Sequence, residues 1–433
     1  MAKQRISLLA SNARIQAPWI KVSIGNYTFG VFSKTSANKQ SHDGTYYTSF
    51  EVQYPNYVKS LGITKINGQV NQYELSLVYP VTQTSDPNFF EKILSSVSKT
   101  RKIVFSYGDM SMPTYIYKNE EAIITKVKQS FNLKGGGEIT YTISAVSSAA
   151  LAAGGSWTFQ GVKARPSEII KRILKDSRYG LQKLFYGMNA SNIDILIAGD
   201  DKEVSIGSKR NISALDYITY LVSCMIPQGA TTQQYTSSDI YVLTMHDDTT
   251  YDSNTFSDLE ISGPYFRVER QSYKTNKSDA FEIDIGFGNT GTIVTEFSVL
   301  DDEGYALLYD YNEKLDTSPY IERIDQNGKL QTIWSPSVTS KNESFKTRTE
   351  DITWWTKVTK YPIKATITVQ GLLRPAILMS HVRLNVIYPG GRKHVSSGLY
   401  LVTQQRDQID SNGYRTQLQL TKIAGDNDPY KNT

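Results

Sequence analysis

Two segments near opposite ends of the chain share one pattern: a strand, a glycine-containing turn and a second strand. The first is TKVKQSFNLKGGGEITYTISA at residues 125–145, and the second is TQQRDQIDSNGYRTQLQLTKI at residues 403–423. When Thr125 is aligned with Thr403, the turns coincide and both returning strands alternate between apolar and polar residues. Each hairpin is the last one of a β-rich region. The sequence therefore predicts that one kind of β domain occurs twice in this chain.

The first β-rich region predicts an antiparallel sheet that carries one helix. Residues 20–32, IKVSIGNYTFGVF, alternate around Gly25-Asn26, which indicates a β-hairpin. Further along, Asp86-Pro87 precedes NFFEKILSSVSKT at residues 88–100. Asp is favoured at a helix N-cap and Pro at the first helical position, so a short helix is expected between strands.

The middle of the chain has helical rather than strand patterning. ARPSEIIKRILKDSRYG, residues 164–180, has apolar residues on one side and predicts a helix that stops at Gly180. SALDYITYLVSCM, residues 213–225, predicts a second helix with Ser213 as the N-cap. Strand patterning returns at residues 239–313 and again after residue 363.

The expected fold class is mainly β with α+β parts. Two tube-like antiparallel β domains, each barrel- or sandwich-like with a short helix, are separated by a small helical or α+β middle domain and further β segments. The expected boundaries follow the chain in order. The first tube-like domain covers residues 1–150 and the middle domain covers residues 151–235. A β-rich domain follows at 236–345, and it either stands alone or contributes to the second tube-like domain. That second domain covers residues 346–425, and residues 426–433 form a disordered tail.

Composition excludes several classes of protein. Cys224 is the only cysteine, so a scaffold held by intrachain disulfides is excluded. No apolar run reaches the length of a membrane helix, and the run at residues 6–10 is too short for a signal peptide. The net charge of +5 is nearly balanced for 433 residues and does not require a nucleic-acid partner. We therefore expect a chain that folds in a cytoplasm.

Three segments resemble the baseplate hub, or tail-hub, proteins of long-tailed bacteriophages and related contractile injection systems. They are LGITKINGQVNQYELSLVYPVTQTSDPNFFEKILSSVSKTRKIVFSYGD at residues 61–109, PSEIIKRILKDSRYGLQKLF at residues 166–185 and GLYLVTQQRDQIDSNGYRTQLQLTKIAGD at residues 398–426. The resemblance covers most of the chain as an order of segments. None of these motifs is a catalytic signature.

The resemblance implies a virion structural protein of the tail tip or baseplate, assembled in the host cytoplasm. Its partners would be two further copies of itself, a tail-tube or distal-tail ring, a trimeric spike or tail-tip protein, and the tape-measure protein. A homotrimer with two tube-like domains per chain would form a pseudo-hexameric ring. That ring would act as a symmetry adaptor between a hexameric tube and a trimeric spike in the injection machine, and genomic DNA would only pass through its channel.

The candidate site residues are interface residues. They are Gly135, Gly136, Gly137, Asn412, Gly413, Trp354 and Trp355. The first five form the two hairpin turns. The adjacent tryptophans would face opposite sides of a strand, so one could enter a core while the other packs on a partner. No catalytic residue, cofactor or metal site is predicted.

Two alternative functions remain open from the residues. A tail-associated peptidoglycan-degrading enzyme would need a carboxylate pair, a zinc triad or a Cys/His pair. Acidic residues are plentiful, but no pattern marks such a group. A distal-tail or carbohydrate-binding baseplate protein is the second alternative, because the 29 tyrosines could contribute to a sugar-binding surface.

Overall fold

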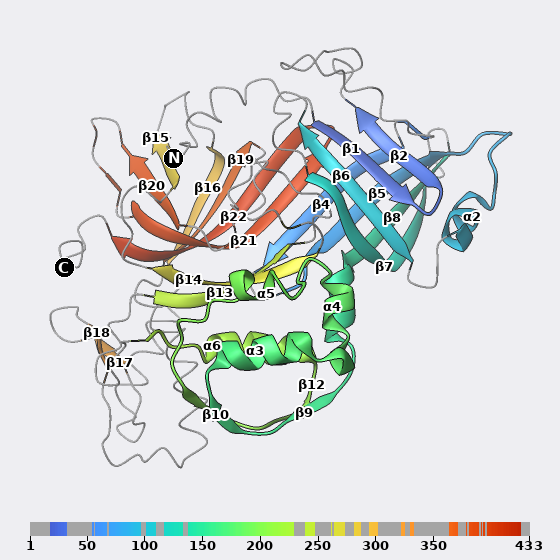
Figure 1. Cartoon of the computed structure of the whole chain (residues 1–433). Coiled ribbons are helices and arrows are strands. Elements are labelled where there is room, and N and C mark those ends of the chain that lie inside the picture. Colours follow the sequence, from blue (N-terminus) through green and yellow to red (C-terminus); the bar gives the residue numbers. More distant parts are fainter. Residues whose placement is uncertain are drawn as a thin grey trace, which may run out of the picture.

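The computed structural model of this chain describes most of its β-rich and helical segments (Figure 1). The described residues are 18–32, 54–55, 57–66, 69–96, 101–109, 117–132, 137–228, 239–246, 261, 264–272, 281–286, 294–301, 322–324, 330–332, 363–370, 378, 381–388, 391, 393–394 and 396–425. The predicted tail at 426–433 lies outside these residues, so its disorder remains a prediction.

Fourteen of the strands belong to one sheet, which confirms a mainly β fold with α+β parts. The first β unit contains β1 (Pro18–Ile24), β2 (Tyr27–Phe32), β3 (Tyr54–Pro55), β4 (Val58–Ile66), β5 (Gln72–Pro80), α2 (Phe89–Ser96), β6 (Lys102–Asp109), β7 (Tyr117–Asn132) and β8 (Glu138–Ser147). The second β unit contains β15 (Phe281–Gly286), β16 (Val294–Asp301), β19 (Ile363–Gln370), β20 (His381–Ile387), β21 (Gly398–Asp410) and β22 (Gly413–Gly425). A separate short pair, β17 (Glu322–Ile324) and β18 (Leu330–Thr332), lies outside the large sheet.

The two β units have the same strand order. The first runs β4-β5-β8-β7-β6, and the second runs β16-β19-β22-β21-β20. Residues that lie opposite one another on neighbouring strands form a row across each sheet, and the rows of the two units also correspond. The row Leu61-Leu75-Ile143-Val127 in the first unit corresponds to the row Phe297-Ile367-Leu418-Gln405 in the second.

The long hairpins contain the same irregularity at the same position. The pairing of β7 with β8 shifts at Thr125, and the pairing of β21 with β22 shifts at Thr403. In both cases the threonine hydroxyl donates to a carbonyl on the returning strand, Ser144 at 3.1 Å and Gln419 at 3.2 Å. A bulge changes the direction of a strand and is a specific structural feature. The predicted equivalence of Thr125 and Thr403 is therefore confirmed.

Each β unit has its own hydrophobic core. In the first unit α2 packs its aromatic residues on the sheet. Phe90 stacks on Tyr141 with 4.3 Å between the ring centroids, and Phe89 stacks on Tyr79 with 4.4 Å between the ring centroids. The predicted helix is present, but it begins at Phe89 and not at Pro87; Asp86 accepts the backbone N–H of Asn88 at 2.9 Å in the turn before the helix. The second core contains residues of β15, β19, β20, β21 and β22.

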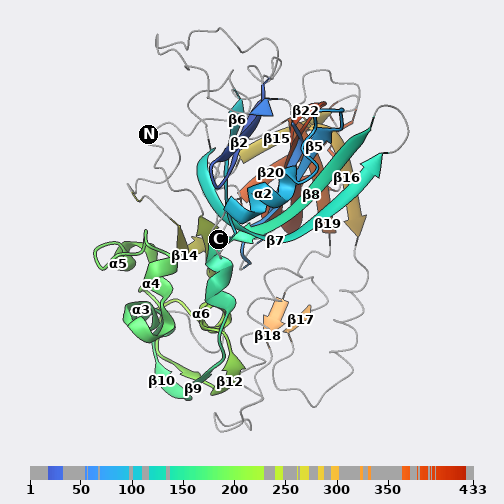
Figure 2. The same ribbon diagram turned by 90° about the vertical axis from the view of Figure 1, so that its right-hand side faces the viewer.

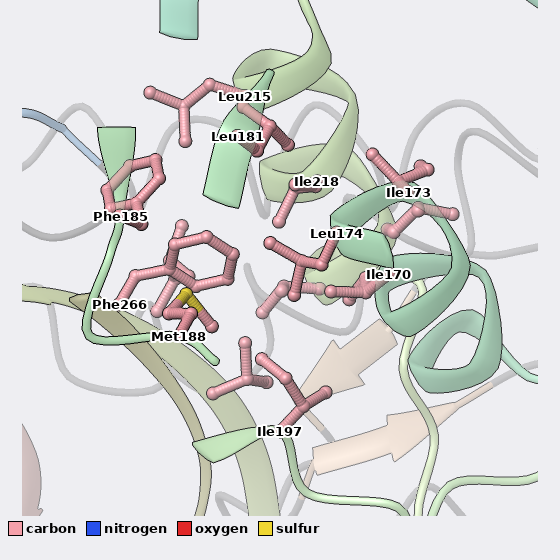
Figure 3. Packing of buried hydrophobic residues seen from close by; sticks show 14 of the residues in the cluster. Ile170, Ile173, Leu174, Leu181, Phe185, Met188, Ile197, Leu215, Ile218 and Phe266 are labelled. Carbon is pink, nitrogen blue, oxygen red and sulfur yellow. The ribbon is translucent and has the colours of Figure 1, made fainter. Parts of the chain in front are cut away.

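Between the β units in sequence lies a third core, built largely from helices (Figure 3). Its elements are η1 (Ser148–Ala153), β9 (Trp157–Phe159), β10 (Val162–Ala164), α3 (Pro166–Lys175), η2 (Ser177–Tyr179), α4 (Leu181–Leu184), α5 (Ile193–Leu196), β11 (Val204–Ile206), β12 (Lys209–Ile212), α6 (Ala214–Ser223), β13 (Asp239–His246) and β14 (Tyr265–Ser272). Ile170 and Leu174 of α3 face Ile218 of α6 across this core, and Phe266 of β14 closes one side. We call this the middle unit; Figures 1 and 2 show it on one side of the large sheet.

Two details of the middle unit bear on the sequence predictions. Ser213 caps α6, because its hydroxyl accepts the N–H of Asp216 at 3.0 Å. The prediction that the helix after Pro166 stops at Gly180 is wrong, since α3 ends at Lys175. Gly180 instead ends the following turn η2 with a left-handed φ of 65°, a conformation that glycine adopts without steric cost.

The strands of the expected 236–345 region join two different cores. β13 and β14 pack in the middle unit, where Tyr241, Leu243 and Phe266 are buried against the helices. β15 and β16 instead pair with β20 and β19 of the second β unit. The pairing thus divides this segment between residues 272 and 281.

We predict that Ile409→Ala destabilises the protein whereas Phe131→Ala does not. The two residues occupy the same position in the two hairpins, but Ile409 is 1% exposed and Phe131 is 61% exposed. Removing a buried isoleucine side chain costs about 2–5 kcal/mol of unfolding free energy, and a surface truncation stays within about 0.5 kcal/mol. Urea titration of both variants measures the difference. Equal losses would show that Ile409 is not a core residue.

Candidate assembly site

The two β units are joined edge to edge within the chain. β21 pairs antiparallel with β4 from Gln404 opposite Ile66 to Ile409 opposite Leu61. In Figure 1 the red strands of the second unit accordingly continue into the blue strands of the first. We call this pairing the junction. It buries Ile409 and Tyr414 of the second unit among the core residues of the first.

Charged side chains lie buried beneath the junction. Glu120 of β7 is fully buried and accepts three hydrogen bonds: from Lys65 Nζ at 3.3 Å, from Tyr73 Oη at 2.8 Å and from Tyr107 Oη at 2.9 Å. The lysine is itself only 6% exposed. A buried carboxylate persists when a cation and further donors surround it, and Glu120 has both.

Asp407 of β21 is a second buried carboxylate at the junction. Its Oδ1 accepts the Thr416 hydroxyl at 2.6 Å, and its Oδ2 accepts Gln405 Nε2 at 2.8 Å. The pKa of Asp407 is raised to about 6, mainly because the side chain is buried, and the nearby charge of Glu120 acts in the same direction. Lys65 and the two hydrogen bonds favour the charged form and partly oppose this rise. Beneath the junction, Lys65 therefore attracts two acidic side chains, one from each β unit.

The two hairpins differ in what covers them. On β21 the side chains of Gln405, Asp407 and Ile409 are buried, because β4 and the first core cover them. The equivalent residues of β7, Val127, Gln129 and Phe131, are half-buried or exposed. Figure 2 shows the β7–β8 hairpin extending beyond the rest of the sheet. One hairpin is thus used inside the chain, while the other remains open to solvent.

The predicted interface residues fall into three groups. Gly137 and Gly413 lie at the two hairpin turns with φ of 68° and 104°, and Asn412 is exposed between Asp410 and Gly413. Gly137 also fixes its turn to the start of the β5–α2 segment, since its carbonyl accepts the N–H of Val81 at 2.7 Å. Gly135, Gly136, Trp354 and Trp355 lie outside the described residues. Their role at an interface remains a proposal.

The described residues hold no group of three or more His, Cys, Asp or Glu side chains arranged to bind a metal ion. Cys224 is the C-cap residue that follows α6 and is buried, at 2% exposure, so its thiol packs in the middle unit. Within the same described residues, no helix has both the length and the hydropathy needed to span a membrane.

The junction charges were missed by the sequence reasoning. The sequence does contain a pattern that indicates them. Lys65 interrupts the apolar face of β4, and Gln405 and Asp407 follow the buried run Leu399–Val402 in β21. Polar residues on the inward face of two separate strands indicate that the strands meet, since a buried charge needs a partner.

We predict that Asp407→Asn removes a pH-dependent term from stability. The pKa of Asp407 is raised from 3.8 to about 6 on folding, so its contribution is fully present below pH 4 and is lost as the pH rises through 6. The unfolding free energy of wild type relative to Asp407→Asn should fall by about 2 kcal/mol between pH 4 and pH 7. Parallel urea titrations across this range measure it. A difference that stays constant with pH would contradict the burial of this charge.

Comparison with known proteins gives structural neighbours only. No family model matches the sequence, and no curated protein matches it. Among solved structures, a 43 kDa prophage tail protein from Shewanella oneidensis aligns with a TM-score of 0.49 and 8% identity, covering 94% of this chain and 99% of its own. A tail protein from Neisseria meningitidis aligns with a TM-score of 0.47 and 10% identity, covering 94% and 97%.

A third neighbour comes from a secretion machine. It is an E. coli component of the type VI secretion system, described as structurally similar to T4 bacteriophage tail proteins. It aligns with a TM-score of 0.41 and 11% identity over 87% of this chain and 76% of its own. These three solved structures are thus two tail proteins, one of them from a prophage, and a type VI secretion component.

Proposed function

We propose that this chain is a structural hub of a phage tail tip or baseplate. Three copies form a ring around the channel for DNA and the tape-measure protein. One face of the ring contacts the hexameric tail tube or a distal-tail ring, and the other face contacts a trimeric spike or tail-tip protein. The role is assembly and sealing rather than catalysis, and its place is the tail of the virion.

The observation that supports this proposal best is the matched duplication. Two β units with the same strand order and the same pairing rows lie edge to edge in one sheet. Three such chains present six similar β units. A head-to-tail contact of this kind repeats from copy to copy, and it closes into a ring when the rotation per copy allows.

The middle unit supports the threefold part of the proposal. Its core is built once per chain, from η1 to β14, and the sheet carries no second copy of it among the described residues. It lies on one side of the sheet in both overall views (Figures 1 and 2). In a ring of three chains, the β units would repeat six times and the middle units three times. Such a ring could match a sixfold partner through its sheet and a threefold partner through its middle units.

The finer assignments belong to the same proposal. We propose domain boundaries near residue 150 and between residues 272 and 281, so that β13 and β14 belong to the middle domain and β15 and β16 to the second tube-like domain. The hairpin turns at Gly135–Gly137 and Asn412-Gly413, together with Trp354 and Trp355, are the proposed interface residues. The hub binds no cofactor of its own.

We predict that the full-length chain, at its highest soluble concentration, forms particles of three copies. Native mass spectrometry counts the copies, and class averages from electron microscopy report the shape. The duplication predicts a ring with six similar lobes and three extra masses on one face. Particles of six copies would instead support a distal-tail or tube ring, and a chain that stays monomeric would contradict the proposed ring.

A further inference from the structure

One half of β7 has an open edge. Its first half pairs with β6, from Lys102 opposite Ile123 to Tyr107 opposite Tyr117. Residues 126–131 pair with β8 on one side, and no described strand pairs with them on the other. An unpaired edge presents backbone N–H and C=O groups that can pair with another strand.

The equivalent half of β21 shows what such an edge accepts. β21 pairs first with β20, through residues 398–401, and then with β4, through residues 404–409. The shared bulge at Thr125 and Thr403 aligns residues 126–131 with residues 404–409. The open stretch of β7 is therefore the counterpart of the stretch of β21 that forms the junction.

A matching open edge lies on β16, the last strand at one end of the described sheet. β16 is the counterpart of β4, because it pairs with β19 as β4 pairs with β5, and both pairings shift near the start of the strand, at Thr295 and Lys59. β4 pairs on its second side with β21, whereas β16 ends the sheet among the described strands. Phe297 and Val299 of β16 are half-exposed, and Val299 is 38% exposed.

We propose that residues 126–131 of one chain pair with β16 of a second copy, in the register that the junction uses inside the chain. The junction places Ile409 opposite Leu61 and Gln408 opposite Gly62. Transferred through the duplication, Phe131 of one copy lies opposite Phe297 of the next, and Ser130 lies opposite Ser298. The proposal rests on the ring assembly proposed above and names the strands that close it.

The side chains of the two edges are complementary. Phe131 is 61% exposed, although its counterpart Ile409 is buried in a core, so pairing would bury an aromatic side chain that the single chain leaves in water. The open stretch of β7 carries Lys126 and Lys128 with no acidic residue, and β16 carries Glu296 and Asp301 with no basic residue. In the proposed register Lys128 lies opposite Leu300 and Asp301 lies opposite Val127, so the charges act through the opposite net charge of the two strands and not through facing pairs. This net attraction still favours the pair over two identical edges, which would repel.

The buried charges of the junction oppose the wrong pairing. If β21 of one copy paired with β16 of another, the acidic residue Asp301 would take the strand position of Lys65, opposite Gln405 and two positions from Asp407 in register. Like charges at that position are unfavourable, and Asp407 would lose the cation that favours its charged form. The two hairpins are therefore not interchangeable. β21 suits β4, and β7 suits β16.

Disulfide trapping tests the register. In Ser130→Cys/Ser298→Cys, six strands of the sheet separate β7 from β16 within one chain, so only different chains can join the two cysteines. The native Cys224 is buried. Mild oxidation should give a ladder of covalent species on a denaturing gel that ends at three chains. Each single variant should give no ladder, because the contact is between different strands.

Register is controlled by moving one cysteine along the same strand. In Ser130→Cys/Thr295→Cys the second cysteine lies three residues further along β16, roughly 10 Å away, beyond the Cβ–Cβ separation that a disulfide spans. This variant should give no ladder. Equal ladders from both double variants would overturn the proposed register.

The outcomes separate this inference from the proposed function. Particles of three copies without a ladder would overturn the strand pairing and leave the trimeric hub in place. A ladder that continues past three chains would support the pairing and contradict the threefold ring. Monomers without a ladder at the highest soluble concentration would overturn the pairing.

A second variant tests the buried aromatic side chain. Phe131→Asp should abolish the ladder in the double-cysteine background, because it places a charge in the proposed interface. Ile195→Asp is the matched control, since Ile195 is 57% exposed on α5, outside the sheet. The control should keep the ladder, and both variants should keep the unfolding midpoint of the parent. An unchanged ladder in Phe131→Asp would contradict the proposed contact.

Discussion

The pairing of β21 with β4 is the interaction on which the arrangement of this protein depends. It joins residues more than 300 positions apart in sequence and turns two β units into one sheet. Pairing alone does not fix which strands meet, because backbone hydrogen bonds carry little sequence information. The buried Asp407 contributes to that selection, because the pairing with β4 brings it near Lys65, which already binds Glu120 inside the first unit. Closing so long a connection is entropically costly, and burial of Ile409 and Tyr414 helps to offset it.

Duplication preserved geometry far better than side chains. The pairing rows and the bulges at Thr125 and Thr403 coincide. The side chains do not: Gly398 of the second unit occupies the position of Glu120, and Asp301 occupies the position of Lys65. Backbone pairing tolerates such changes because alternation of inward and outward residues is all that the sheet requires. The charged residues could therefore diverge, so that one copy of the edge serves inside the chain and the other stays open.

Sequence patterning predicted the local elements well and their partners poorly. The turn at Gly25-Asn26, the cap at Ser213 and the two long hairpins follow from alternation and from residues with known turn and cap preferences. The division of the 236–345 segment did not follow, because β13 and β15 have similar patterns and only tertiary packing separates them. Side chains on a strand alternate between its two faces, and a bulge shifts this alternation by one residue. A prediction from alternation alone therefore places Gln405 and Asp407 on the outward face, although they face inward.

An open strand edge is also a risk, and the composition of β7 shows how this chain limits it. Lys126 and Lys128 sit on the open stretch, and lysines on an edge oppose pairing with a second identical edge. The same lysines favour a strand that carries acidic residues, as β16 does with Glu296 and Asp301. One pair of side chains thus disfavours aggregation of like edges and favours the heterologous contact. Because heterologous contacts build rings or open chains, the charge pattern restricts which strands meet, and the angle between the two β units decides whether the ring closes.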